Sequence, residues 1–109
     1  METIRAVEAL GALAQASRLQ VYRLLVQTGP EGIPAGELAE YLNVPANTLS
    51  FHLKALSHAG LVLTRQDGRF IYYSANYGQM NALLGFLTEN CCGGRDCKPA
   101  AAPRKRRVS

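Results

Sequence analysis

The chain has 109 residues, which is enough for one domain with a modest core and excludes a multidomain enzyme. Hydrophobic residues make up 48% and charged residues 18%, a balance typical of a globular domain rather than a disordered chain. No apolar run approaches the roughly 18–20 residues that span a bilayer, and the acidic Glu2 and Glu8 argue against an amino-terminal signal peptide. We therefore expect a cytoplasmic protein without a membrane segment.

The net charge of +4 is unevenly distributed along the chain. Five of the 12 basic residues lie at or beyond Lys98, where no acidic residue occurs, so residues 1–97 carry seven basic and eight acidic side chains. The net charge alone is therefore poor evidence for nucleic-acid binding. Residues 98–109 are predicted to form a disordered basic tail that adds non-specific attraction to phosphates or only keeps the chain soluble.

Periodicity and turn signals predict an α+β fold, mostly α, with about five helices and one two-stranded hairpin. Capping boxes at Ser17–Gln20 and Asn76–Gln79 open two of the helices, and Pro45 suits the first position of another. Asp67 and Gly68 form the hairpin turn. The expected elements are helices over residues 3–14, 17–27, 35–42 and 45–59, strands over residues 61–66 and 69–74, and a helix over residues 77–90.

The fourth of these helices is amphipathic. Leu49, Leu53 and Leu56 form its apolar stripe, and a polar and cationic set lies on the opposite face. A short helix, a tight turn and such a helix make a helix-turn-helix, and the hairpin that follows makes it a winged helix over residues 1–90. This fold presents the outer face of its second helix to the DNA major groove, although helix-turn-helix units also serve as protein-binding modules.

The predicted DNA contacts follow from side-chain chemistry. Asn47 and Ser50 can hydrogen-bond base edges or phosphates, Lys54 can reach a phosphate, and Phe51 can touch a thymine methyl group. Two arginines flank the hairpin tip, where a wing meets the DNA backbone or minor groove. The full set of candidate DNA-binding residues is Asn47, Thr48, Ser50, Phe51, Lys54, Arg65 and Arg69.

The motifs resemble a known family. The run Asn47–Leu56 followed by Ala59–Val62 is similar to the recognition-helix signature of the ArsR/SmtB winged-helix regulators, and Gly68–Tyr73 resembles their wing. The resemblance covers residues 3–90. It implies a homodimeric bacterial repressor that pairs through its first and last helices and releases its operator on binding a metal or metalloid. The apolar stripes that fit such pairing are Ile4, Val7 and Leu10 on the first helix and Met80, Leu83 and Leu87 on the last.

Three cysteines, Cys91, Cys92 and Cys97, follow the last predicted helix. Clustered thiols suit soft ions, and three sulfurs suit trivalent arsenic or antimony. A zinc site normally has four ligands, but His52 is expected to be structural and His58 solvent-facing. The alternatives are another soft metal, a monosubstituted arsenical held by the adjacent pair, redox sensing, or vestigial cysteines without a function. A thiol redox enzyme is disfavoured because no Cys-x-x-Cys pair and no organic-cofactor loop is present.

The resemblance also indicates where the sensor site is expected, because this sequence lacks the ligands of the family's two usual sites. Many arsenic sensors of the family carry cysteines on the first helix of the helix-turn-helix, but residues 37–42 contain none. Zinc sensors carry Asp, His and Glu ligands on the last helix, where residues 77–90 offer only Glu89. The cysteine-containing segment 91–97 instead resembles a subset of the family that senses As(III), with Sb(III) as a second inducer.

Overall fold

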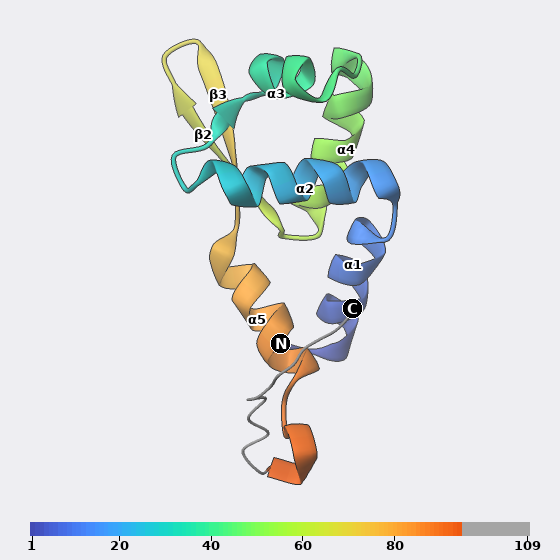
Figure 1. Cartoon of the computed structure of the whole chain (residues 1–109). Coiled ribbons are helices and arrows are strands. Elements are labelled where there is room, and N and C mark those ends of the chain that lie inside the picture. Colours follow the sequence, from blue (N-terminus) through green and yellow to red (C-terminus); the bar gives the residue numbers. More distant parts are fainter. Residues whose placement is uncertain (95–109) are drawn as a thin grey trace, which may run out of the picture.

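The computed structural model describes residues 1–94, which fold into five α-helices, a three-stranded antiparallel sheet and a short 3₁₀ turn (Figure 1). None of the helices in this part of the chain is long and apolar enough to cross a membrane. The helices are α1 (Thr3–Leu13), α2 (Ala16–Thr28), α3 (Ala35–Leu42), α4 (Ala46–His58) and α5 (Tyr77–Leu87). The strands are β1 (Ile33–Pro34), β2 (Val62–Asp67) and β3 (Phe70–Ala75), and the 3₁₀ turn is η1 (Cys91–Gly94).

The predicted winged helix-turn-helix is confirmed, with a sheet one strand larger than expected. The strand order is β1-β3-β2, and Ile33 pairs with Tyr73. The strand β1 is two residues long and contains Pro34, so it leaves no periodic signal and could not be recognised from sequence.

The hairpin turn lies one residue later than predicted. Asp67 pairs with Phe70, so the two-residue loop consists of Gly68 and Arg69. Gly68 has a φ of 63°, which glycine adopts without steric cost at the first position of such a loop. The shift places Arg69 in the loop itself rather than at the start of a strand.

Two helix starts also differ from the prediction. The residue that caps α2 is Gln15, whose Oε1 accepts a hydrogen bond of 2.8 Å from the backbone N–H of Arg18, so Ser17 lies inside the helix. Pro45 is the residue before α4 rather than its first residue. The cap at Asn76 is confirmed, since its Oδ1 accepts from the backbone N–H of Gln79 at 3.2 Å.

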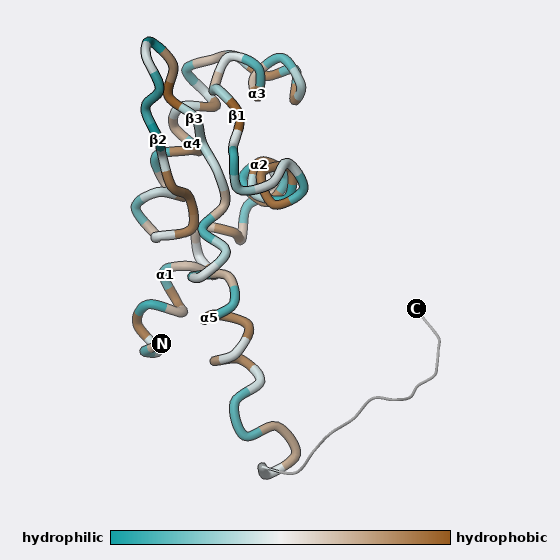
Figure 2. Tube along the Cα trace, turned by 90° about the vertical axis from the view of Figure 1, so that its left-hand side faces the viewer, coloured by the Kyte–Doolittle hydropathy of each residue, from teal (hydrophilic) through white to brown (hydrophobic). Residues whose placement is uncertain are grey.

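The core lies where α2, α3, α4 and the sheet meet. Its largest fully buried side chains are all leucines: Leu25, Leu38, Leu49, Leu53, Leu56 and Leu61. The helices α1 and α5 project from this core at the end opposite to α3 and the hairpin, and hydrophobic residues run along both of them (Figure 2). The predicted stripe on α5 is partly internal, because Leu83 is buried and Met80 packs against the core.

Candidate nucleic-acid interface and thiol segment

The two faces of α4 are divided as the sequence predicts. Leu49, Leu53 and Leu56 are buried, and His52 joins them at 7% exposure. The Nδ1 atom of His52 is buried without a hydrogen-bond partner in residues 1–94, which fits the predicted structural role. All five candidate DNA-binding residues of this helix are exposed: Asn47, Thr48, Ser50, Phe51 and Lys54.

The amino-terminal turn of α4 presents hydrogen-bond donors to solvent. Pro45, the residue before the helix, provides no side-chain cap, so the N–H groups of the helix ahead of Thr48 are available to an anion such as a phosphate. The Oδ1 atom of Asn47 accepts a hydrogen bond of 2.9 Å from the backbone N–H of Thr48. Because the side-chain oxygen is engaged, the amide of Asn47 offers its NH₂ group to a ligand.

Phe51 is the apolar member of this exposed face. Its side chain is 67% exposed, and its ring lies edge-on to the imidazole of His52 with a centroid distance of 6.0 Å. When a binding partner covers a largely exposed phenyl ring, the burial of its apolar surface stabilises the complex. In the major groove the apolar group available for such contact is the thymine methyl.

The wing lies at the same end of the molecule as the amino terminus of α4 (Figure 1). Its two arginines differ in their surroundings. Arg65, on β2, donates a hydrogen bond of 2.9 Å from Nη2 to the carbonyl oxygen of Glu31 and lies 3.6 Å from a carboxylate oxygen of Asp67. Arg69 lies in the exposed loop at the tip and has no side-chain hydrogen bond or ion pair within residues 1–94.

The contact between Arg65 and Glu31 was not predicted from the sequence. Glu31 belongs to the loop between α2 and β1, which is 34 residues away along the chain. The one local signal in that loop is Gly32, whose φ is 84° and at which a Cβ atom would lie 2.7 Å from the carbonyl oxygen of Tyr73. The loop therefore passes very close to β3, which only glycine permits there.

The first two cysteines lie just beyond α5, at the end of the molecule away from the wing. The Sγ atoms of Cys91 and Cys92 are 3.7 Å apart. Gly93 and Gly94 both have positive φ, so the backbone bends just after the two cysteines. Cys97 and the basic tail lie outside the described residues. Within residues 1–94 no group of three or more His, Cys, Asp or Glu side chains is positioned to hold a metal.

Comparisons with known proteins agree with this geometry. A family model described as a helix-turn-helix domain matches residues 13–65. The Arsenical resistance operon repressor of Bacillus subtilis is 35% identical over 91 residues, covering 79% of this chain and 83% of that protein. This chain belongs to the ArsR-like family of winged-helix transcriptional regulators. The ArsR-like regulator described here is thus a DNA-binding protein and not an enzyme, which removes the redox-enzyme alternative.

Two solved structures resemble this ArsR-like regulator in fold. An ArsR-like transcriptional regulator from Rhodococcus sp. RHA1 has a TM-score of 0.71 at 27% identity, covering 77% of this chain and 76% of that one. The homodimeric winged helix-turn-helix domain of a possible ArsR-family regulator from Mycobacterium bovis has a TM-score of 0.62 at 26% identity, covering 84% of each chain.

Proposed function

We propose that this ArsR-like regulator is a homodimeric repressor that binds an operator through α4 and the wing. In this proposal As(III) or Sb(III) binds the thiolates of Cys91, Cys92 and Cys97 and releases the DNA. The observation that carries the DNA half is the exposed face of α4, where Asn47, Ser50, Phe51 and Lys54 stand opposite a buried leucine stripe.

Exposed apolar side chains on α1 and α5 support a dimer. Ile4 and Val7 on α1 are 71% and 61% exposed, and Leu84 and Leu87 on α5 are each 54% exposed. These two helices lie together at the end of the molecule away from the amino terminus of α4 and the wing (Figure 2). A second copy that covers them would bury the residues and place two copies of α4 for two half-sites on one DNA face.

Cys91 and Cys92 are close enough for one ion to be held by both sulfurs once Cys92, which is disulfide-bonded in the structure, is reduced. Two thiolates bound to one tetrahedral ion such as zinc, each about 2.3 Å from it, are about 3.8 Å apart, and the smaller angle of a pyramidal As(III) site brings the sulfurs slightly closer. The Sγ atoms are 3.7 Å apart. With arsenous acid, each As–S bond forms as one hydroxyl of the acid and one thiol proton leave as water. The bend at Gly93 and Gly94 gives the chain a way to bring a third sulfur to the same ion.

The location of the cysteines suggests how binding lowers DNA affinity. They follow α5, which carries part of the proposed dimer surface, and not the DNA-facing helix. An ion that orders this segment biases the relative orientation of the two subunits and thereby the spacing of the two α4 helices. By linkage, the ion must then bind the free dimer more tightly than the DNA-bound dimer.

A gel shift at fixed salt tests both halves. Full-length protein, reduced with a phosphine, is mixed with a labelled fragment of its own promoter and titrated with arsenite or antimonite. We expect binding and then release. Serine substitutions at Cys91 and Cys92 should keep DNA affinity and lose release, whereas Glu89→Gln, in the same segment, should respond like the wild type.

The outcomes separate the alternatives. Equal loss of response with all three cysteine variants indicates a three-sulfur site, and indifference at Cys97 indicates a pair that suits a monosubstituted arsenical. Release by Cu(I) or Cd²⁺ but not by the metalloids favours another soft metal, and release only by an oxidant favours redox sensing. Either result overturns metalloid sensing, and absence of promoter binding overturns the repressor.

A further inference from the structure

The side chain of Arg65 crosses the sheet and adds a contact between the wing and the body of the protein to the pairing of β1 with β3. Arg65 on β2 is in register with Tyr72 on β3, and Tyr72 is in register with Pro34 on β1. The guanidinium carbon of Arg65 lies 4.5 Å from the centroid of the Tyr72 ring, and its Nη2 donates to the carbonyl oxygen of Glu31 just before β1. The side chain therefore extends over β3 to the loop beyond it.

The loop that receives this side chain is itself fixed in place. Gly32 brings the backbone so close to Tyr73 that any Cβ atom would collide with the carbonyl oxygen of Tyr73. The loop also follows directly on α2, the helix that packs against α4. A contact from β2 to Glu31 thus connects the wing to the same body that holds the recognition helix.

The ion pair between Arg65 and Asp67 argues against a phosphate-binding role for Arg65. Asp67 lies 3.6 Å from the guanidinium, but the two side chains are 52% and 71% exposed, so this ion pair contributes little to stability. Its negative charge nevertheless lowers the positive potential that Arg65 offers to DNA. Arg69, in the loop at the tip, has no such carboxylate partner within the described residues.

We infer that Arg65 is a positioning residue that sets the angle of the wing, and that Arg69 supplies the phosphate contact of the wing. This assignment rests on the DNA recognition proposed above and revises the sequence-based role of Arg65 as a DNA contact. Beyond the pair Arg65 and Tyr72 the wing is a two-stranded ribbon, which is only marginally stable alone, so its tip reaches DNA reproducibly only when its base is held. A planar guanidinium can stack on Tyr72 and donate to Glu31 together, whereas the ammonium of lysine cannot do both equally well.

Lysine substitution separates the two roles, because lysine keeps the charge that a phosphate contact needs. We expect Arg65→Lys and Arg65→Ala to weaken promoter binding alike, by about tenfold, the size of one lost charge-assisted hydrogen bond. Both should lower the slope of log affinity against log salt by about 0.9, because a wing held at another angle no longer brings Arg69 to its phosphate. Arg69→Ala should lower that slope by about 0.9, the value for one phosphate contact, and Arg69→Lys should keep it.

Hydroxyl-radical footprinting distinguishes loss of the wing contact from general destabilisation of the protein. In Arg65→Lys the protection given by the wing should be lost while the protection given by α4 remains. Tyr72→Leu, which removes only the stacking surface, should give the same pattern if Arg65→Ala folds poorly. Wild-type affinity in Arg65→Lys together with a lower salt slope in Arg65→Ala would overturn the inference, as would wild-type binding by every Arg65 variant. Absence of any promoter binding by the wild type would overturn DNA recognition as well.

Discussion

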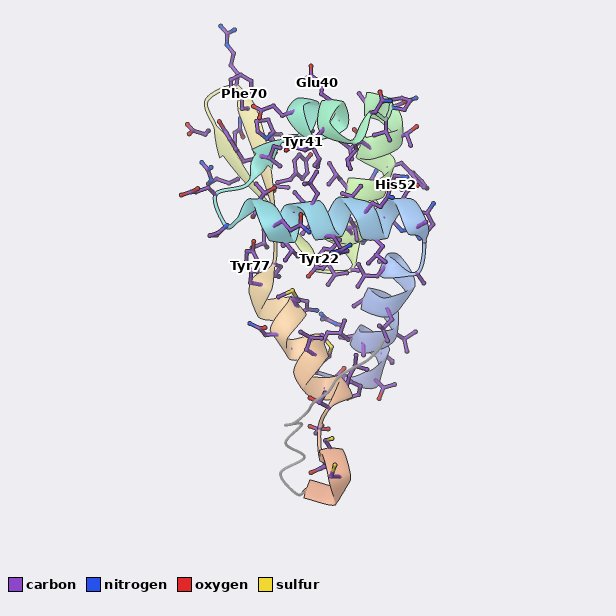
Figure 3. The ribbon with its side chains drawn as sticks, viewed as in Figure 1. Tyr22, Glu40, Tyr41, His52, Phe70 and Tyr77 are labelled. Carbon is purple, nitrogen blue, oxygen red and sulfur yellow. The ribbon has the colours of Figure 1, made fainter. Side chains whose placement is uncertain are left out.

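The phenol hydroxyl of Tyr77 donates a hydrogen bond of 2.9 Å to the carbonyl oxygen of Val26, and the carbonyl oxygen of Leu25 lies 3.4 Å from it. Tyr77 is the first residue of α5, and both carbonyls belong to the last turn of α2, where helix carbonyls lack intrahelical partners. One side chain thus caps a core helix and anchors the helix proposed to form the dimer. Tyr22, on α2, lies next to Tyr77 (Figure 3).

Removing the hydroxyl of Tyr77 should loosen this anchor. Tyr77→Phe leaves the α2 carbonyls without this donor, so we expect the free energy of unfolding to fall by about 1 kcal/mol. Urea unfolding followed by circular dichroism measures the change. Tyr41→Phe is the matched control, because Tyr41 is 75% exposed and its hydroxyl has no hydrogen bond within the described residues. Equal effects of the two substitutions would contradict the capping role.

Removing the hydroxyl of Tyr22, unlike that of Tyr77, should not lower the free energy of unfolding. The Tyr22 hydroxyl is buried without a hydrogen-bond partner in residues 1–94. Such a group carries a desolvation cost that no bond offsets, so Tyr22→Phe should leave stability at pH 7 unchanged or raise it by about 1 kcal/mol. The same urea unfolding experiment measures it. A loss of stability as large as that of Tyr77→Phe would mean that the hydroxyl of Tyr22 has a partner in solution.

Burial raises the pKa of the Tyr22 phenol above its ordinary value of 10.0, and the neighbouring Tyr77 raises it further. Above pH 10 the unfolded chain has therefore lost a proton that the folded chain still holds. The stability linked to Tyr22 is fully present below pH 10 and is lost as the pH rises through the folded-state pKa. Unfolding midpoints from pH 9 to 11 should fall less steeply in Tyr22→Phe than in the wild type. Parallel curves would refute this linkage.

The helices were predictable because their signals are local. The leucine stripe of α4 and the cap at Asn76 each lie within a few residues, and both are confirmed. The contacts that set the wing depend on chain segments far apart in sequence, as in the 34-residue separation of Glu31 and Arg65. No local periodicity encodes such a pair. The hairpin turn was misplaced by one residue because Gly68 fits either turn position, and only pairing with β3 decides between them.

The proposed dimer requires the exposed leucines of α5 to lie in the interface between the two subunits. Leu87→Glu places a charge on each of two symmetry-related surfaces, so we expect the dimer dissociation constant to rise by about 100-fold or more. Sedimentation equilibrium measures it. Leu63→Glu, on the wing strand β2, is the control because Leu63 is 51% exposed and lies outside the proposed dimer surface on α1 and α5. A dimer that survives Leu87→Glu but dissociates with Leu63→Glu would place the interface on the sheet.

Asn47→Asp should separate DNA affinity from stability. The substituted oxygen can still accept from the backbone N–H of Thr48, and a carboxylate near the amino terminus of α4 interacts favourably with the helix dipole. Stability should therefore be kept. The donor NH₂ group is replaced by a negative oxygen, so promoter affinity should fall by about tenfold or more. Gel shift and urea unfolding report the two quantities, and wild-type affinity would remove Asn47 from the interface.

Phe51 should make promoter binding depend on a single methyl group. Replacing each thymine of the bound site in turn by deoxyuridine removes only the 5-methyl group. At the position that Phe51 covers, we expect a loss of about fourfold, the value of one buried methyl-sized group. Phe51→Ala should bind more weakly overall and show no further loss at that position, which is the coupling that a double-mutant cycle detects. Phe70→Ala is the control, since Phe70 is an exposed phenylalanine on the wing, at 58% exposure. Uniform insensitivity of the wild type to deoxyuridine would mean that the ring of Phe51 packs against the DNA backbone instead.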